Sequence, residues 1–268
     1  MAIPSSARTP LARELGRTVF GRDVAGYHEV RPGYPEELFR KIAERVLPGG
    51  VFGEIGPGTG LATAGLLDLN PKRFVGFEPD AALAGFLRQR FPSIEVVNDD
   101  FCAVPVSGPF DLIASASSFH WLDANAALEK ARRLLACGAC LAIWWNVYRE
   151  TGVGDHFAEA VAPLLLDIDL PPSQTAEHHY GLDRAFHFER LSANGFVDLE
   201  YQLFRRERML SPEEARSLYS TFSLVRLLPE DRREGLLDAI SNVVREKFGG
   251  AAPSVLLTPL YVARKSSS

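Results

Sequence analysis

The sequence has 268 residues, 46% of them hydrophobic and 24% charged, which is the profile of an ordinary globular protein rather than a disordered or fibrous one. Its formal net charge of -5 provides no positive field of the kind that gathers nucleic acid or an anionic membrane, so a small-molecule partner is favoured. No apolar run approaches the roughly 20 residues of a membrane helix, and residues 1–15 lack the apolar core of a secretory signal. Three cysteines are too few for a disulfide framework, so we expect a cytoplasmic protein with reduced thiols.

From residue 51 the chain alternates short β-rich runs with longer helical patterns. Such alternation indicates βαβ units, and therefore a doubly wound α/β fold with a mostly parallel sheet. The expected strands are 51–55, 73–77, 94–98, 110–114 and 139–145, and the expected helices between them are 59–69, 80–90 and 123–135.

The rhythm changes after residue 145. We expect helices at 153–166 and 183–194, a loop at 167–181 between them, and strands at 196–204 and 254–262. Ser211 and Pro212 have the cap and first-turn proline of a helix start, and Pro229 opens a long helix that ends near Phe248. The segment 205–253 is too long for a hairpin turn, so we expect it, with 151–194, to cover a substrate pocket.

A glycine-rich turn joins the first expected strand to the first expected helix. The strand ends at Glu54 and Ile55 and runs directly into Gly56-Pro57-Gly58-Thr59-Gly60. A turn this tight needs glycines for positive φ and for close approach of a ligand to bare backbone. The strand-turn-helix context favours a nucleotide-type ligand over a purely structural turn.

The charge beside this turn favours one class of nucleotide. A dinucleotide fingerprint needs Gly or Ala at the sixth position counted from Gly56, but Leu61 stands there. Glu54 would repel a pyrophosphate, whereas it would attract the ammonium and sulfonium groups of S-adenosylmethionine, directly or through a water. The sequence therefore favours S-adenosylmethionine over NAD.

Acidic residues also follow the second and third expected strands. Glu78 stands 18 residues after Gly60, close to the spacing of about 20 at which an acid accepts hydrogen bonds from both ribose hydroxyls. Asp99 or Asp100 is placed to accept from the adenine amino group, and Phe101 to flank its ring. The alternatives are that Glu78 caps the next helix and that the two aspartates only terminate a turn.

Together these residues resemble the class I S-adenosylmethionine-dependent methyltransferases, in their small-molecule branch. The segments that carry the resemblance are EIGPGTG at 54–60, EPD at 78–80, DF at 100–101, FDLI at 110–113 and FHWLD at 119–123. Upstream, YHEVRPGYP at 27–35 is similar to the opening of trans-aconitate methyltransferase-like proteins. Trans-aconitate itself would require a basic pocket that the sequence does not locate, so that substrate is not carried over.

The resemblance implies a seven-stranded sheet in a single domain, 1–268, with an N-terminal helical segment, 1–45, over the cofactor and a cofactor-binding core at 46–150. It implies methyl transfer to O, N or C of a small molecule. The expected cofactor contacts are Tyr27, Arg31, Glu54, Gly56, Gly58, Gly60, Glu78, Pro79, Asp100, Phe101 and Ser115.

Methyl transfer from a sulfonium depends on positioning and desolvation, and a base is needed only if the acceptor is protonated. His120 follows the fourth expected strand, near where the methyl group should emerge, and is the candidate general base; the alternative is a packing role in an aromatic-rich turn. Trp121, Trp145 and Tyr148 join His120 as candidate acceptor-binding residues. Strand alternation places one of the neighbours Trp144 and Trp145 in the core.

Two further patterns indicate structure rather than chemistry. Cys137 and Cys140 have redox spacing, but they follow a helix end instead of starting a helix. Adjacent His178 and His179 lack a second ligand cluster, so no metal is expected. The rival functions are a non-catalytic S-adenosylmethionine sensor or partner subunit and an NAD-linked oxidoreductase.

Overall fold

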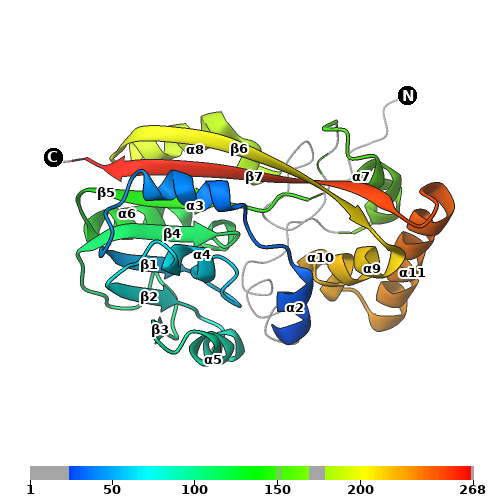
Figure 1. The fold of residues 1–268 in the computed structure, drawn as a ribbon, viewed down its shortest axis with the longest axis horizontal. Coiled ribbons are helices and arrows are strands. Elements are labelled where there is room, and N and C mark those ends of the chain that lie inside the picture. Colours follow the sequence, from blue (N-terminus) through cyan, green and yellow to red (C-terminus); the bar gives the residue numbers. More distant parts are fainter. Residues whose placement is uncertain (1–23, 149, 151, 169–178, 267–268) are drawn as a thin grey trace.

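A seven-stranded sheet with the order β3-β2-β1-β4-β5-β7-β6 forms the centre of the computed structural model, which describes residues 24–148, 150, 152–168 and 179–266. The strands β1 to β5 pair in parallel, and β7 is antiparallel to both of its neighbours, β5 and β6. Their bounds are β1 Val51–Ile55, β2 Arg73–Phe77, β3 Glu95–Val97, β4 Phe110–Ala116, β5 Leu135–Trp144, β6 Phe196–Leu210 and β7 Ala252–Lys265. The predicted doubly wound α/β fold with a mostly parallel sheet is confirmed (Figure 1).

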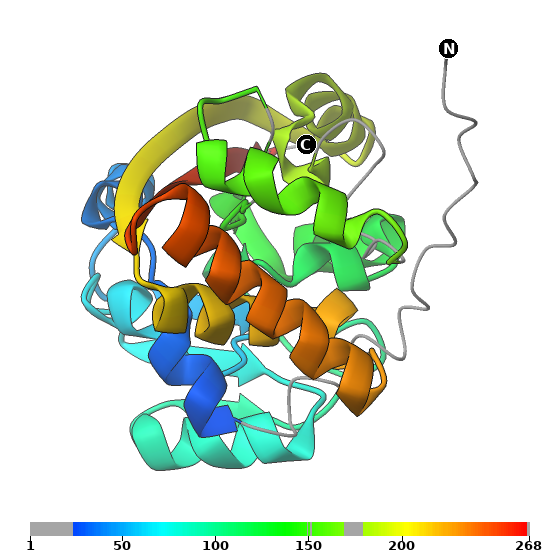
Figure 2. The same cartoon turned by 90° about the vertical axis from the view of Figure 1, so that its right-hand side faces the viewer.

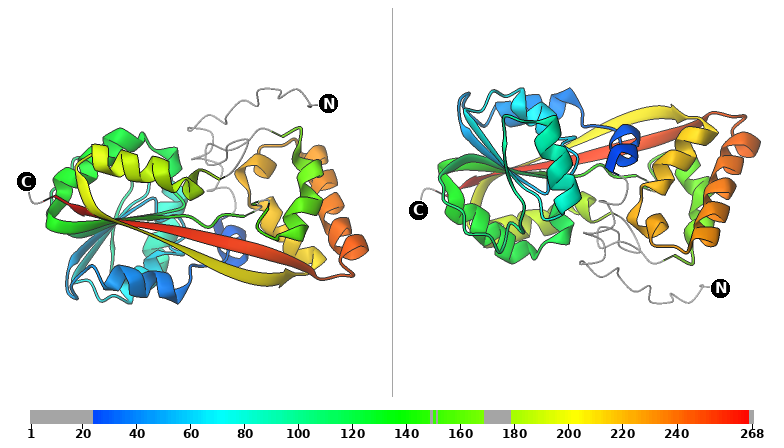
Figure 3. Two further views of the ribbon diagram at one scale, coloured as in Figure 1. Left: turned by 90° about the horizontal axis from the view of Figure 1, so that it is seen from above. Right: turned by 90° about the horizontal axis from the view of Figure 1, so that it is seen from below.

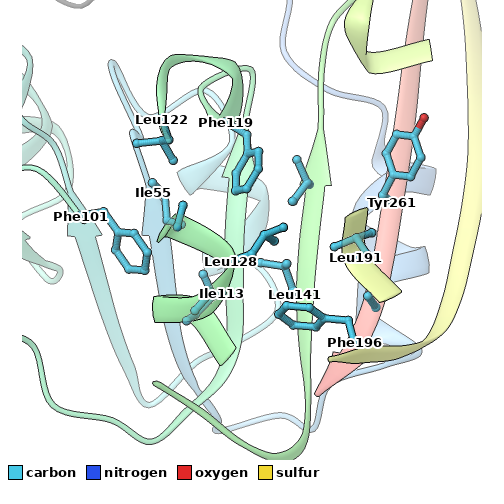
Figure 4. Close-up of a cluster of buried hydrophobic side chains, with 14 of the residues drawn as sticks. Ile55, Phe101, Ile113, Phe119, Leu122, Leu128, Leu141, Leu191, Phe196 and Tyr261 are labelled. Atoms are coloured by element: carbon cyan, nitrogen blue, oxygen red, sulfur yellow. The ribbon is translucent and has the colours of Figure 1, made fainter. Parts of the chain in front are cut away.

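Helices cover both faces of the sheet, which explains why the parallel strands are apolar almost throughout. One face packs on α3 (Glu36–Ala43), α4 (Thr63–Leu67) and α5 (Ala81–Arg90). The other packs on α6 (Ala124–Leu134) and α8 (Arg184–Ala193), as seen from above and below in Figure 3. Figure 4 shows the core of this second face, where Leu128 of α6 and Leu191 of α8 join buried side chains from the sheet.

The strand order determines where a ligand can bind. From β1 the chain builds outward to β2 and β3, then returns to place β4 on the other side of β1. The connections after β1 and β4 therefore leave the sheet in opposite directions, and in such folds ligands bind in the crevice at the carboxyl ends of these strands. The glycine-rich turn follows β1 at this point.

A helical lobe lies at the end of the molecule toward which the parallel strands point, beyond their carboxyl ends (Figures 1 and 2). It has its own buried cluster, in which Phe157, Tyr219 and Val244 are each at most 2% exposed. Its elements are α7 (His156–Val161), η3 (Ala162–Leu165), α9 (Pro212–Ser220), α10 (Ser223–Arg226) and α11 (Glu230–Lys247). The strands β6 and β7 connect this lobe to the sheet.

The last two strands are longer than predicted. The sequence indicated 196–204 and 254–262, whereas β6 continues to Leu210 and β7 runs from Ala252 to Lys265. Residues 205–209, RRERM, are mostly charged, which is not typical of a strand, and they alternate between exposed and half-buried positions. They nevertheless pair residue by residue with β7. Pairing with the buried strand β7 thus overrides the low strand propensity of these residues. As a result, the segment between β6 and β7 is 211–251 rather than 205–253.

None of the helices in the described ranges is both long and apolar enough to cross a membrane. Cys102, Cys137 and Cys140 are free thiols. Residues 1–23 of the expected N-terminal segment lie outside the described residues, as do Arg149 and His178, and what the structure describes of that segment begins with α2 (Val24–Val30).

Candidate functional site

A cavity of about 920 Å³, its open mouth included, lies at the carboxyl ends of β1, β2 and β4. Its walls come from the turns that follow these strands and β3, and from the chain around α2. They include Tyr27, Tyr34, Gly56, Pro57, Gly58, Thr59, Leu61, Glu78, Pro79, Asp100, Phe101, Ser117, Ser118 and Trp121. Seven of the residues proposed above for the cofactor are thus brought together at one site, namely Tyr27, Gly56, Gly58, Glu78, Pro79, Asp100 and Phe101.

The three glycines of the turn all have positive φ, but their surroundings differ. Gly58, at φ 59°, faces open space, since a Cβ built there would meet no atom within 4 Å. A Cβ at Gly56 would lie 2.7 Å from Ser118 Cβ, and one at Gly60 would lie 2.3 Å from the ring of Phe91. Gly58 is therefore the position where bare backbone faces the cavity, whereas the other two allow close packing within the protein.

Glu78 brings a carboxyl group to the cavity wall. Its Oε2 accepts a hydrogen bond from the Gly58 backbone N–H at 2.9 Å, and its Oε1 accepts from that of Asp80 at 3.0 Å. The residue is 4% exposed, and burial raises the pKa of its carboxyl to about 7. Asp80 itself caps α5 by accepting from Ala82 and Leu83, so Glu78 is not needed as the helix cap.

Glu54 lies behind the turn rather than on the cavity wall. It is fully buried, Thr63 donates to its Oε2, and its Oε1 has no partner among the described residues. Burial raises the pKa of this carboxyl to about 8. The electrostatic argument from sequence treated Glu54 as an anion beside the ligand, and this needs correction: without a positive charge nearby, burial favours the protonated form at neutral pH.

Asp100 and Phe101 form the wall that follows β3. Phe101 is 1% exposed and packs edge-on against Phe77 with ring centroids 5.2 Å apart. Asp100 lines the cavity while its Oδ1 accepts from the backbone N–H of Cys102, so its part in the turn is observed and its contact with adenine stays a prediction. Asp99 accepts from the Asp100 N–H and is not a wall residue.

The short helix α2 connects the glycine turn to the helical lobe. Tyr27 lines the cavity, and the Nδ1 atom of His28 is 3.0 Å from Oγ1 of Thr59 in the turn. Arg31 is not on the cavity wall. Its guanidinium lies between the rings of Tyr27, Tyr148 and Phe222, with its Cζ atom 5.2, 5.0 and 4.6 Å from their centroids, and it donates to the Thr221 carbonyl at 3.1 Å.

Tyr148 was expected at the acceptor site, and it instead packs on Arg31 between the sheet and the lobe. His28 and Tyr34 are two residues that sequence reasoning missed. Tyr34 lines the cavity and donates from its hydroxyl to Ser117 Oγ at 3.1 Å. Both belong to the YHEVRPGYP segment, so its similarity to a known opening was the signal that could have found them.

Four candidates lie in or just after β4 and β5: Trp121 is on the cavity wall, and Ser115, His120 and Trp145 are not. Ser115 is fully buried with its hydroxyl 2.7 Å from that of Ser118. His120 lies in the 3₁₀-helix η2 (Phe119–Trp121), and its Nδ1 accepts from the Trp145 indole N–H at 3.1 Å. The neighbours Trp144 and Trp145 are both in the core, at 0% and 1% exposed, so Trp145 does not form the acceptor wall that the sequence suggested. The two side chains pack on opposite faces of the sheet.

Comparison with known proteins agrees with this arrangement. A family model described as a methyltransferase domain matches residues 53–138. An uncharacterized methyltransferase-like protein of Schizosaccharomyces pombe is 26% identical over 240 residues, 87% of this chain and 90% of the relative. A solved methyltransferase-family structure from Anaeromyxobacter dehalogenans covers 88% of this chain and 98% of its own, at a TM-score of 0.66 and 22% identity.

A further solved structure, Haemonchus contortus phosphoethanolamine N-methyltransferase 2 in complex with S-adenosyl-L-methionine, covers 98% of this chain and 61% of its own, at a TM-score of 0.58 and 14% identity. At such identities these two structures establish the fold alone. The family match and the relatives add similarity in sequence to similarity in fold. Together they support a class I methyltransferase, with the methyltransferase domain matched over residues 53–138.

Proposed function

We propose that this protein transfers a methyl group from S-adenosylmethionine to a small-molecule acceptor. The observation that carries the proposal is the Glu78 carboxyl group on the cavity wall, hydrogen-bonded to the backbone of the glycine turn at Gly58. A carboxylate there has lone pairs left to accept the two hydroxyl groups of a ribose, and the adjacent bare backbone admits the rest of a nucleoside.

The other walls suit a nucleoside that carries no phosphate. Phe101 and Asp100 provide an apolar ring and an acceptor oxygen for adenine at the end of β3. Leu61 lines the cavity at the position where a dinucleotide fingerprint needs Gly or Ala, and no cationic side chain of the described residues stands on the wall. This argues against NAD, whose pyrophosphate needs compensating donors or charge.

Glu54 fits the positive charge of the proposed cofactor in a different way from the one the sequence suggested. Its Oε1 is buried without a partner among the described residues, and burial holds its pKa at about 8. A cationic ligand next to the turn would lower that pKa and stabilise the carboxylate, because an opposite charge favours the ionised form. Because Glu54 is not on the cavity wall, we expect a water between the ligand and the unpartnered Oε1 to satisfy this oxygen.

When bound, S-adenosylmethionine supplies a methyl group on a good leaving group, and the chain's part is to orient both reactants and exclude water. Tyr27 of α2 and Tyr34, which comes after α2, form one side of the cavity. Trp121, in the turn after β4, forms another side. Arg31 ties α2 to the helical lobe through Thr221 and Phe222. We therefore place the acceptor between this side of the cavity and the lobe.

The small-molecule acceptor is favoured over nucleic acid by the net charge of -5 and by the position of the helical lobe beyond the cofactor cavity. A lobe in that position limits the size of an acceptor that can reach the cavity. A non-catalytic sensor would keep the same cofactor contacts, so binding alone does not separate the two.

Titration calorimetry with S-adenosylmethionine and with NAD tests the cofactor. We expect S-adenosylmethionine to bind and NAD not to, and binding of NAD alone would refute the proposal. Release of S-adenosylhomocysteine is then screened across small acids, amines, phenols and ring compounds. Turnover with one of these classes supports the enzyme, whereas binding without turnover of any acceptor supports the sensor.

A further inference from the structure

Ser117 follows β4 on the cavity wall and holds a backbone conformation that serine rarely adopts. Its φ is 53°, in the left-handed region, which it shares with Asn70 and Asp198 among the non-glycine residues that the structure describes. Asparagine and aspartate tolerate this region better than serine does, so Ser117 is held there by its surroundings. Strained backbone of this kind is concentrated at functional sites, and Ser117 lines the proposed cofactor cavity.

Both lone pairs of the Ser117 hydroxyl are already in use. The Tyr34 hydroxyl donates to Ser117 Oγ at 3.1 Å, and the backbone N–H of Asn146 donates to the same oxygen at 3.1 Å. Burial raises the pKa of Tyr34 above its usual value, so this phenol keeps its proton and remains a donor. Because a hydroxyl group has two lone pairs and one proton, Ser117 has only its proton left to offer, and no described residue accepts it.

The two donors are held in place by distant parts of the chain. The side-chain nitrogen of Asn146 donates to the Pro32 carbonyl at 2.9 Å, and its Oδ1 accepts from the Thr258 hydroxyl at 2.8 Å. The ring of Tyr34 packs edge-on against Trp144, with centroids 5.7 Å apart. The direction from which each donor approaches Ser117 is therefore set by packing, and this leaves one direction for the Ser117 proton.

The other donors around the glycine turn have partners inside the protein. The backbone N–H groups of Gly56, Gly58 and Gly60 all donate to protein oxygens. The Ser118 hydroxyl, also on the wall, donates to the Ile55 carbonyl. No Lys, Arg or His of the described residues lines the cavity. An anionic group of a ligand at this end of the cavity would thus have the Ser117 hydroxyl as its donor.

The order of the strands places Ser117 away from the adenine wall. The sheet runs β3-β2-β1-β4, with Phe101 after β3, Glu78 after β2 and Ser117 after β4, all on the cavity wall. With adenine and ribose placed as proposed above, the amino-acid end of S-adenosylmethionine extends across the turn after β1 toward β4. That end carries an ammonium and a carboxylate, and of these two only the carboxylate accepts a hydrogen bond.

We propose that Ser117 is a binding residue for the carboxylate of S-adenosylmethionine, to which it donates a hydrogen bond because Tyr34 and Asn146 use both lone pairs of its hydroxyl. This inference rests on the proposed function and deepens it, since it assigns the amino-acid end of the cofactor to a residue that the sequence did not single out. The ammonium lies away from Ser117, because it needs an acceptor and this hydroxyl has none left.

Titration calorimetry at pH 7 with two ligands tests this polarity. One ligand is S-adenosylmethionine, and the other is its decarboxylated form, which keeps the adenosine, the sulfonium and the ammonium. In Ser117→Ala the affinity for S-adenosylmethionine should fall about tenfold more than the affinity for the decarboxylated ligand, because only the first ligand loses a hydrogen bond to a charged group. The ratio of the two affinities is the readout, so a general loosening of the cavity, which weakens both ligands, does not imitate the effect.

The matched control is Ser118→Ala, one position away on the same wall, because the proton of this hydroxyl is already donated within the protein. It should change the two affinities by the same factor. Ser117→Gly, which suits the positive φ, should lose the same preference as Ser117→Ala and replaces it if the alanine variant does not fold.

An unchanged ratio in the Ser117 variants overturns the inference, as does an equal change of the ratio in Ser118→Ala. Either result would leave the binding of S-adenosylmethionine by the native protein, and with it the proposed function, intact. If neither ligand binds the native protein, the proposed function fails and this inference fails with it.

Discussion

The ionisation of Glu78 should control cofactor affinity near neutral pH. Burial raises the pKa of this carboxyl to about 7 in the unliganded protein, and each of its oxygens already accepts one backbone N–H. Only the carboxylate has lone pairs available on both oxygens for the two ribose hydroxyls, because the protonated group uses one oxygen to carry its proton. S-adenosylmethionine should therefore bind the deprotonated protein and bind more tightly as the pH rises.

The size of the effect follows from the fraction of Glu78 that is ionised. With a pKa of about 7, that fraction is about 0.09 at pH 6 and about 0.9 at pH 8. Since the apparent dissociation constant is the intrinsic one divided by the competent fraction, the ionisation of Glu78 by itself should raise the affinity about tenfold between these pH values. Glu78 should contribute about 0.9 proton to the protons released on binding at pH 6 and about 0.1 at pH 8, in addition to the protons that Glu54 releases.

Titration calorimetry in buffers of different ionisation enthalpy measures both the affinity and the released protons. The amino group of the ligand and Glu54 also titrate near pH 8, so the native protein is compared with Glu78→Gln, in which these two contributions remain and only that of Glu78 is lost. We expect this variant to lose about tenfold or more in affinity at pH 8, where hydrogen bonds to a charged group are lost. An exposed carboxyl on the neighbouring strand, changed by Glu95→Gln, should leave both quantities as in the native protein.

The reasoning would be refuted by either of two results. One is the same dependence of affinity on pH in Glu78→Gln as in the native protein. The other is equal proton release at pH 6 by the native protein and by Glu78→Gln, because the Glu78 carboxyl would then be ionised before the ligand binds.

Because the pKa of Glu54 is about 8 in the folded protein, the folded protein binds more protons than the unfolded chain between about pH 4.5 and 8, and its stability should fall as the pH rises through that range. Glu54→Gln should remove the part of this decline that Glu54 causes. In calorimetry, the variant should raise the Tm of the cofactor-free protein at about pH 8.5 by several degrees. Gly58→Arg should abolish binding of S-adenosylmethionine, because its side chain enters the cavity, and should lower the Tm only through the strain of a side chain at positive φ. Gly60→Ala should lower the Tm further, because it adds a clash of the new Cβ with the half-buried ring of Phe91. Equal effects of the two changes on binding and on Tm would contradict this division. Arg31→Met should increase hydrogen exchange in α2 by about tenfold, because a stacked guanidinium that also donates to a carbonyl stabilises by about 1–2 kcal/mol. Arg245→Met, which breaks an exposed ion pair, should not change exchange in α2.

The sequence alone determined the parallel core and placed seven of the expected cofactor contacts at one cavity. The bounds predicted for β1 and β2 agree with the structure at both ends, because each strand is an apolar run that stops at a turn or an acid. Gly58, Glu78 and Phe101 meet at one cavity because the carboxyl ends of parallel strands share one edge of the sheet. Short-range sequence patterns are therefore sufficient to predict those cavity residues whose position depends only on where each strand ends.

Only the tertiary structure decided which side chains face the cavity and which charges they carry. Glu54 is behind the turn and Trp145 is in the core, although both stand beside residues that line the site. Arg31 has its partners at Tyr148 and Thr221, which lie far along the chain. Burial and hydrogen bonding depend on these distant neighbours, so the protonation of a carboxyl group is a property of the packed molecule and not of the local sequence.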